Sequence, residues 1–236
     1  MIPIRAFLVL GLSLVLGLSI FGIQIGRAVR TGREFDRYLT VRGLAEREVK
    51  ADLALWPIRF SVSAEDLVTL KNSMEGNRAL VLAYLQSNSI TTNEIKLGLP
   101  TVSDRLDERI QANRPNLPRY RGVVTMVVRS QNVDIVKKAI QGADALLEKG
   151  VTLVDDEYRG HIEFTFKSVN EAKPAMIKEA TANARAAAEK FAQDSNSQVG
   201  RIRKATQGVM EIEDRDAASP EWKILRVVTT VDFFLN

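Results

Sequence analysis

The side chains that most often do chemistry in proteins are few in this chain. His161 is the only histidine among the 236 residues, and cysteine is absent. One histidine alone cannot complete a usual zinc site or a Ser-His-Asp triad. Without cysteine the chain has no disulfide and no thiolate nucleophile. We therefore expect His161 to lie on the face of a strand, without a catalytic role.

Two acidic runs are the next candidates, because carboxylate oxygens bind hard cations such as calcium. Asp155, Asp156 and Glu157 stand together at an expected hairpin turn, and a second run covers 211–216. Neither run has the spacing of an EF-hand loop, and turns favour aspartate for conformational reasons. We interpret the first run as a turn, with metal binding as the alternative, and the second as a solvated loop.

Four arginines surround a proline-containing segment and the strand expected after it: Arg114, Arg119, Arg121 and Arg129. They could contact an acidic partner, although a solvated strand edge is the simpler interpretation. The sequence has no glycine-rich phosphate loop, no Gly-x-Ser-x-Gly elbow and no His-Glu-x-x-His pair. We assign no catalytic, cofactor-binding or metal-ligating residue and expect a protein that is not an enzyme.

The amino terminus predicts where the protein resides. From Ala6 to Ile25 the chain is apolar except for two serines, one glutamine and three glycines. At 1.5 Å rise per residue, about 20 helical residues reach roughly 30 Å, the thickness of the hydrocarbon core of a bilayer. We predict a membrane-spanning helix over 6–26, within an anchor at 1–33. A cleaved signal is the alternative, but it would need a shorter apolar core and a better cleavage site.

Net charge is concentrated in this anchor. The chain has 33 Lys and Arg against 29 Asp and Glu, and residues 1–33 hold four arginines and no acid. Residues 34–236 therefore carry 29 of each kind and are neutral. A balanced domain argues against binding to a phosphate backbone, so we expect no nucleic-acid partner. The arginines on either side of the apolar stretch slightly favour a cytoplasmic domain.

Strands and helices alternate in the remaining chain. Apolar alternation predicts strands at 41–62, 93–102, 119–129, 151–155, 161–167, 199–210 and 223–235. Helical spacing of apolar residues predicts helices at 66–88, 132–149 and 170–194. Pro57 cannot donate a ladder hydrogen bond, so we expect a strand edge or a bulge there. Residues 103–118 are expected to form a long excursion with a short helix.

These elements predict an α+β fold in which a mostly antiparallel sheet carries helices on one face. Strand–helix–strand order occurs near 51–102 and again near 119–156. We therefore expect two similar halves within a single domain, 34–236, preceded by the transmembrane helix.

The last predicted helix contains an unusual alanine-rich run, Glu179 to Ala192. Small side chains let a helix lie close to a sheet. Residues at helical spacing predict the buried face: Met176, Ala180, Ala184, Ala187 and Phe191. A closely packed core helix is the main interpretation, and a binding site at Asn183 and Arg185 is the alternative.

Segments spread over most of 40–235 resemble the SIMPL-domain family, the YggE-like proteins of the bacterial envelope. The similar segments are Val41–Gly43, 49–57, 85–95, 120–128, Gly150–Val151 and, most diagnostic, the helix at 179–192. The resemblance implies an exported envelope protein that self-associates, with a role in stress protection. It brings no catalytic residue that could be carried over.

The resemblance favours a domain on the outer side of the membrane. We give it more weight than the arginine count, which slightly favours a cytoplasmic domain. We therefore expect a single-pass inner-membrane protein whose soluble domain lies in the periplasm, forms a homo-oligomer and acts by binding or scaffolding. Two alternatives stay open. One is a hydrolase that uses buried carboxylates, and the other is a cytoplasmic-facing domain that binds a partner.

Overall fold

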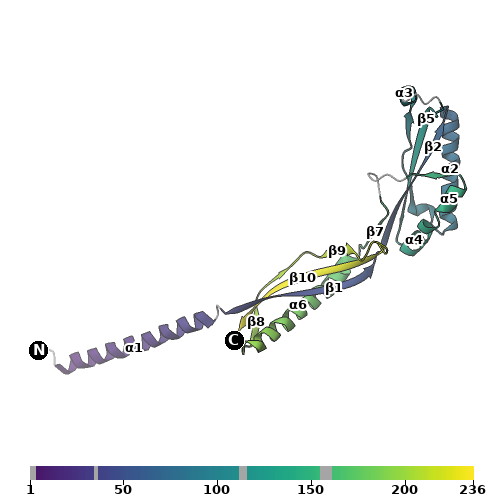
Figure 1. Ribbon diagram of the computed structural model, residues 1–236. Helices are drawn as coiled ribbons and strands as arrows, with labels where there is room; N and C mark the ends of the chain where they lie inside the picture. The colour runs from purple at the N-terminus through teal and green to yellow at the C-terminus, as the bar shows by residue number, and fades with distance from the viewer. Residues whose placement is uncertain (1–3, 35–36, 112–115, 155–160) are drawn as a thin grey trace. The chain divides into compact units, whose positions relative to one another are not determined.

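The computed structural model describes residues 4–34, 37–111, 116–154 and 161–236 (Figure 1). They form an α+β fold of antiparallel sheets and helices, which confirms this part of the prediction. The chain divides into two compact units. Unit 1 consists of Met1–Arg47, Ala172–Glu211 and Leu225–Asn236, and unit 2 consists of Glu48–Glu171 and Ile212–Ile224. Both strand–helix–strand repeats of the sequence lie in unit 2.

Helix α1, Ile4–Glu34, is the first element. Within this helix the solvent exposure of Gly11 and of residues 13–27 is described, and these residues are exposed. In the described part of the chain, no helix is both long and apolar enough to cross a membrane. The apolar stretch at 6–26 extends beyond the described side chains, so its insertion into a membrane stays a prediction.

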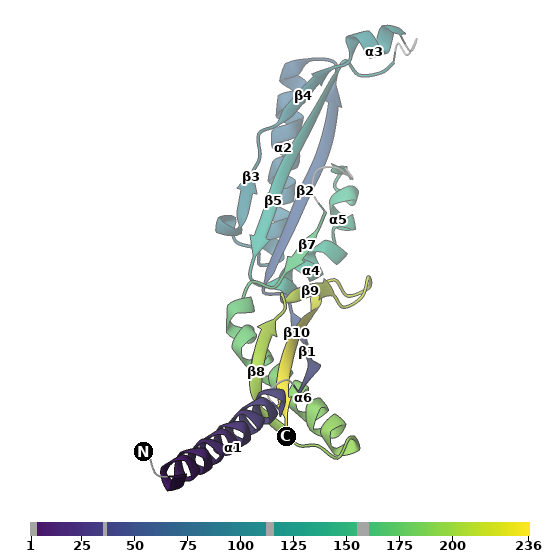
Figure 2. The ribbon, with the colours of Figure 1, turned by 90° about the vertical axis from the view of Figure 1, so that its left-hand side faces the viewer.

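The sequence predicts one sheet, but the described strands form two. The four-stranded sheet has the order β1-β10-β8, and β9 pairs with β10. Its strands are β1 (Tyr38–Lys50), β8 (Val199–Gln207), β9 (Glu211–Asp214) and β10 (Trp222–Leu235). Helix α6, Val169–Asp194, packs on one face of this sheet in unit 1 (Figure 2). The second sheet arises because β1 joins the last strands of the chain, a pairing that local sequence patterns do not encode.

The buried face of α6 differs from the predicted one. Its buried residues follow a strict four-residue spacing: Met176, Ala180, Ala184, Ala188 and Ala192. The prediction was wrong for Ala187, which is partly buried, and for Phe191, which is 61% exposed. Four residues turn a helix about 40° beyond a full turn, so the contact row winds around the helix instead of following a straight stripe.

The six-stranded sheet of unit 2 has the order β3-β5-β2-β6; β4 also pairs with β5, and β7 with β2. Its strands are β2 (Leu53–Ala64), β3 (Ile95–Leu97), β4 (Thr101–Asp104), β5 (Tyr120–Ser130), β6 (Thr152–Leu153) and β7 (Glu163–Thr165). Helices α2 (Leu67–Ser87), α4 (Val133–Gln141) and α5 (Asp144–Glu148) cover one face (Figures 1 and 2). The helix predicted over 132–149 is divided near Gly142, a residue that ends helices readily.

Alternation along β2 and β5 builds the core of unit 2. In β2, Trp56, Ile58 and Phe60 are buried, and the antiparallel register from Ala54↔Ser130 to Ala64↔Tyr120 sets them beside the buried face of β5. Asp66 caps α2 by accepting hydrogen bonds from the backbone nitrogens of Val68 and Thr69. The Tyr84 hydroxyl donates to the Ala139 carbonyl oxygen at 2.5 Å and joins α2 to α4.

The predicted strand at 93–102 is two short strands, β3 and β4, separated by Gly98-Leu99-Pro100. The excursion after them contains the expected short helix, α3 (Leu106–Gln111). Residues 112–115 of that excursion lie outside the described part of the chain. The solvated loop predicted at 211–216 is instead the strand β9 over most of its length, because it pairs with β10 despite its polar composition.

Candidate functional site

On one side of β2, the described strands pair on either side of Pro57 and leave Pro57 between them. On this side β7 pairs with Leu53–Leu55 and β6 with Phe60 and Ser61, and among the described strands none pairs with Pro57. The Arg59 carbonyl oxygen accepts a hydrogen bond from Val154 on this same side, so the backbone of Pro57, two residues earlier, faces this side. Proline has no N–H group, so no donor is left without a partner there. Residues 155–160, which connect β6 to β7 on this side, lie outside the described part of the chain, so the edge or bulge expected at Pro57 stays a prediction.

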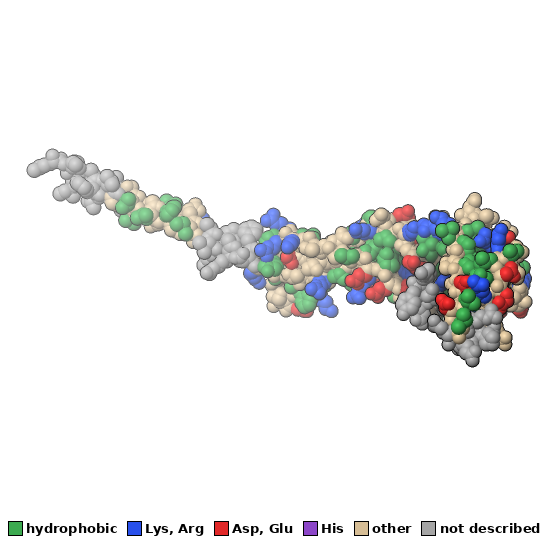
Figure 3. Space-filling view, turned by 90° about the horizontal axis from the view of Figure 1, so that it is seen from above, with side chains coloured by type: hydrophobic (Ala, Val, Ile, Leu, Met, Phe, Trp, Pro, Cys, Tyr) green, Lys and Arg blue, Asp and Glu red, His purple; other side chains and the backbone are tan. Residues whose placement is uncertain are grey.

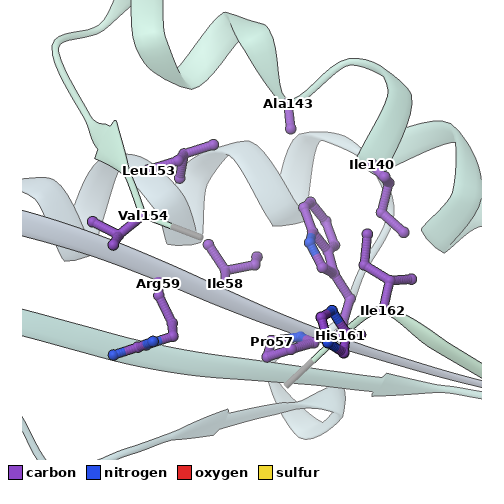
Figure 4. Close-up of a pocket in the computed structure, with 10 residues that line it drawn as sticks. Pro57, Ile58, Arg59, Ile140, Ala143, Leu153, Val154, His161 and Ile162 are labelled. Atoms are coloured by element: carbon purple, nitrogen blue, oxygen red, sulfur yellow. The ribbon is translucent and has the colours of Figure 1, made fainter. Parts of the chain in front are cut away.

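A cavity of about 410 Å³ lies beside Pro57 (Figure 4). Leu153 and Val154 lie toward one end, and His161 and Ile162 toward the other. The lining is mostly apolar, with the guanidinium of Arg59 and the imidazole of His161 as its charged or titratable groups. Such a cavity suits a small apolar molecule, because ligand cavities are commonly apolar with a few polar groups.

His161 stands in the segment just before β7, exposed to solvent, rather than on a strand face as predicted. Among the described residues that line this cavity, none carries a carboxylate or a serine or threonine hydroxyl. In the part of the chain that the structure describes, no group of three or more acidic or histidine side chains could hold a metal ion. The run Asp155-Asp156-Glu157 lies outside the described residues.

The buried carboxylate of unit 2 belongs to Glu221, which is 4% exposed. Lys137 of α4 donates a hydrogen bond to its Oε1 atom, and its buried Oε2 atom has no hydrogen-bond partner. Burial raises the pKa of Glu221, but the hydrogen bond and charge of Lys137 outweigh it, so the pKa lies below the usual value. A hydrolase that uses buried carboxylates would need two acidic side chains close together. The carboxylate of Glu221 is instead paired with Lys137.

The acidic run at 211–216 supplies ion pairs. Asp214 pairs with Lys223, whose side chain is nearly buried, and Asp216 accepts a hydrogen bond from Arg215 at 2.8 Å. Arg215 also contacts Glu48 at 2.5 Å. The hydrogen bond from Arg215 lowers the pKa of Asp216. These contacts hold the turn between β9 and β10.

The predicted arginine cluster is only partly assembled. Arg119 pairs with Asp104 at 2.9 Å, which ties β4 to the start of β5 and lowers the pKa of Asp104. Arg121 and Arg129 follow along β5, and Arg114 lies outside the described residues. Arg129, Lys96 and Lys167 line a polar cavity of about 950 Å³ at one end of the sheet. Asp52, in the same cavity, is engaged by the backbone nitrogens of Lys167 and Ser168.

The two residues of the alternative site on α6, Asn183 and Arg185, both make contacts within unit 1. Asn183 Nδ2 donates to the Leu44 carbonyl oxygen at 2.8 Å, which fastens α6 to β1. Arg185 pairs with Glu189 at 3.0 Å and lies over the Phe233 ring at 5.9 Å. Both side chains are therefore used within unit 1.

The outer edge of the six-stranded sheet exposes apolar side chains. Five of them form what we name the apolar edge: Leu97, Leu99, Val102, Leu106 and Ile110. Leu99 is 92% exposed, and all four residues of β4 are exposed. A groove of about 310 Å³ between α2 and β4 adjoins the edge and is lined by Leu70, Met74 and Val102 among others. The edge and the groove together form a mainly apolar surface in unit 2.

A family model named SIMPL, described as a protein of unknown function (DUF541), matches residues 39–225. The chain belongs to the SIMPL family. The match covers all of unit 2 and about half of unit 1, and it leaves out α1 and most of β10. No curated protein matches the chain. Because the family description assigns no activity, the function of this SIMPL protein has to be inferred from its own surfaces.

Several contacts of this SIMPL fold are not predicted by the sequence pattern. One is the close approach of Gly43 to α6. The pairs Lys137–Glu221 and Lys223–Asp214 join residues that the sequence pattern did not connect. A charged residue inside an apolar alternating strand, such as Lys223 in β10, is the signal that could have revealed a buried ion pair.

Proposed function

We propose that this SIMPL protein is anchored in the inner membrane by α1 and self-assembles through the apolar edge of unit 2 to act as a binding scaffold in the cell envelope. The exposed outer edge of β4 carries this proposal. Among the described strands, none pairs with β4 on that side. An unpaired edge with exposed apolar side chains is a template for pairing with another chain.

The groove beside β4 supports a second copy of the chain as the occupant. It is mainly apolar, and Leu99 from a neighbouring copy, 92% exposed in the single chain, is of a size to enter it.

The mass of the full chain in mild detergent tests the self-assembly. We expect particles of several times 26.3 kDa. Val102→Lys combined with Leu99→Lys should lower the mass toward that of one chain, since charges on an edge oppose pairing. Val209→Lys is the matched control, because Val209 is 85% exposed but lies in unit 1. Equal masses for the wild type and the edge variant would show that the chain does not self-assemble through the apolar edge.

The membrane part of the proposal rests on the apolar stretch at 6–25 and on the arginines Arg27, Arg30 and Arg33 that follow it. Such flanks are typical of helices that end in the headgroup region. A reporter fused after Asn236, active only on one side of the membrane, tests the orientation. We expect activity on the periplasmic side. Activity on the cytoplasmic side would favour the cytoplasmic partner-binding alternative instead.

A further inference from the structure

Charge is divided unequally between the two units. Outside residues 1–36, unit 1 contains 11 Lys and Arg against 6 Asp and Glu, a net charge of +5. Unit 2 contains 18 Lys and Arg against 21 Asp and Glu, a net charge of −3. The neutral total of residues 34–236 therefore conceals a basic unit, and this unit contains the strand that follows the predicted anchor.

Some of the basic side chains of unit 1 lie on α6, and others lie on the sheet face opposite α6. In β10 the buried residues Val231 and Phe233 face α6, so the alternating residues Asp232 and Phe234 point away from it. Lys204 of β8 stands opposite Asp232 in the register. Figure 3 shows Lys and Arg side chains close together on unit 1 near the start of β1.

Arginines and aromatic rings are paired on this face. The Arg203 guanidinium lies 4.1 Å from the centre of the Tyr38 ring, and that of Arg201 lies 5.5 Å from the Phe234 ring. We name Tyr38, Arg201, Arg203, Lys204 and Phe234 the basic face. Asp232, an acid on the same face, accepts a hydrogen bond from Thr40 at 2.7 Å. The face thus presents three cations on a partly aromatic surface.

The chain itself keeps this face close to the end of α1. Helix α1 ends at Glu34, and β1 begins at Tyr38. Four residues of extended chain reach at most about 14 Å, so Tyr38 stays within that distance of the end of α1 whatever the orientation of the helix. If α1 spans the membrane with residues 6–26, the rest of the helix rises about 12 Å and the linker adds at most about 14 Å, so Tyr38 lies within about 26 Å of the hydrocarbon core.

We propose that the basic face binds the anionic phosphate headgroups of the lipid bilayer into which α1 inserts. The proposal rests on the proposed anchoring by α1. Guanidinium groups bind phosphate through paired hydrogen bonds, and aromatic rings with a polar tip settle at the membrane interface. Each Lys or Arg close to an anionic membrane contributes about a five-fold gain in binding. Three such residues favour the docked state on the order of 100-fold, provided that their contributions add.

The test uses the full chain reconstituted in vesicles of phosphatidylcholine, alone or mixed with phosphatidylglycerol. Because the chain has no cysteine, Thr206→Cys creates a single labelling site on β8, opposite Thr230 and next to the basic face. Energy transfer from a fluorophore at this site to labelled headgroups reports docking. We expect transfer at least several-fold stronger in the anionic vesicles, and loss of this gain at high salt.

A triple variant and a charge-matched control decide the result. R201Q/R203Q/K204Q should abolish the gain in anionic vesicles, whereas K173Q/K178Q/K190Q, which removes three exposed lysines from α6, should keep it. The proposal is overturned if the wild type shows no stronger energy transfer in anionic vesicles, or if both variants lose this increase equally. Thermal unfolding of each variant at the wild-type temperature shows that a loss does not reflect misfolding.

Flotation with vesicles distinguishes failure of the proposed anchor from failure of the basic face. If α1 does not insert, the full chain will not float with pure phosphatidylcholine vesicles. Flotation with the anionic vesicles alone, lost in R201Q/R203Q/K204Q, would then still support the basic face. Absence of flotation with both vesicle types would overturn it together with the anchor.

Discussion

Gly43 of β1 lies directly against Ala184 of α6. A Cβ atom added to Gly43 would stand 2.8 Å from the Cβ atom and 2.5 Å from the backbone nitrogen of Ala184, and 1.8 Å from the carbonyl oxygen of Ala180. The backbone of the helix thus fills the space of a missing side chain on the strand. This contact explains why an alanine-rich helix and a glycine in the first strand occur together.

Gly43→Ala is expected to destabilise the protein by about 3 kcal/mol, since the new methyl group meets helix backbone that cannot move aside alone. Gly76→Ala is the matched control. No atom lies within 4 Å of a Cβ at Gly76, which stands inside α2, so alanine there should stabilise by about 0.5–1 kcal/mol. Chemical denaturation of both variants measures the difference. Equal unfolding free energies would refute the close contact.

The buried row on α6 predicts a contrast between two neighbouring alanines. Ala188 is 0% exposed, so Ala188→Leu should cost about 1–3 kcal/mol by overpacking. Ala186 is exposed, and leucine forms helices nearly as well as alanine, so Ala186→Leu should change the unfolding free energy by less than about 0.5 kcal/mol. Thermal denaturation distinguishes this row from the one predicted by sequence, in which Ala187 and Phe191 are buried.

The Lys137–Glu221 pair predicts a pH dependence of stability. Burial raises the pKa of Glu221 and Lys137 lowers it, and the effect of the lysine is the larger. The carboxyl group of Glu221 therefore binds a proton less tightly in the folded protein than in the unfolded chain. The stabilisation is then complete above the unfolded pKa of about 4.3 and is lost as the pH falls through the lower folded value. Glu221→Gln should weaken this dependence in unfolding curves recorded between neutral and acidic pH.

Glu75→Gln is the control for that experiment, because Glu75 is an exposed acid of α2. Lys137→Met supplies a second comparison. It leaves a buried carboxylate without its cation and should cost about 2 kcal/mol at neutral pH. If Glu221→Gln leaves the loss of stability at acidic pH unchanged, and Lys137→Met leaves the unfolding free energy unchanged, the pair does not contribute to stability.

Local patterns account for much of the fold. The alternation in β2 and β5 and the apolar spacing in α2 each predicted their elements, because short-range periodicity determines which face is buried. The expectation of a strand edge or a bulge at Pro57 came from its missing N–H group alone. The α+β class followed from the order of these elements.

The remaining features depend on contacts between distant parts of the chain. Joining β1 to β10 makes the second sheet, although about 190 residues separate Thr40 from its partner Asp232. Strand β9 is too polar for an alternating pattern to reveal it. The burial of Glu221 depends on Lys137 of α4, 84 positions away. No local window of sequence contains such pairs.

The mass of the detergent-solubilised full chain tests the central claim, self-assembly through the apolar edge, most directly. The account predicts a wild-type particle of several chains and a particle near 26.3 kDa for Leu99→Lys combined with Val102→Lys. A wild-type particle of one chain at micromolar concentration would contradict the account.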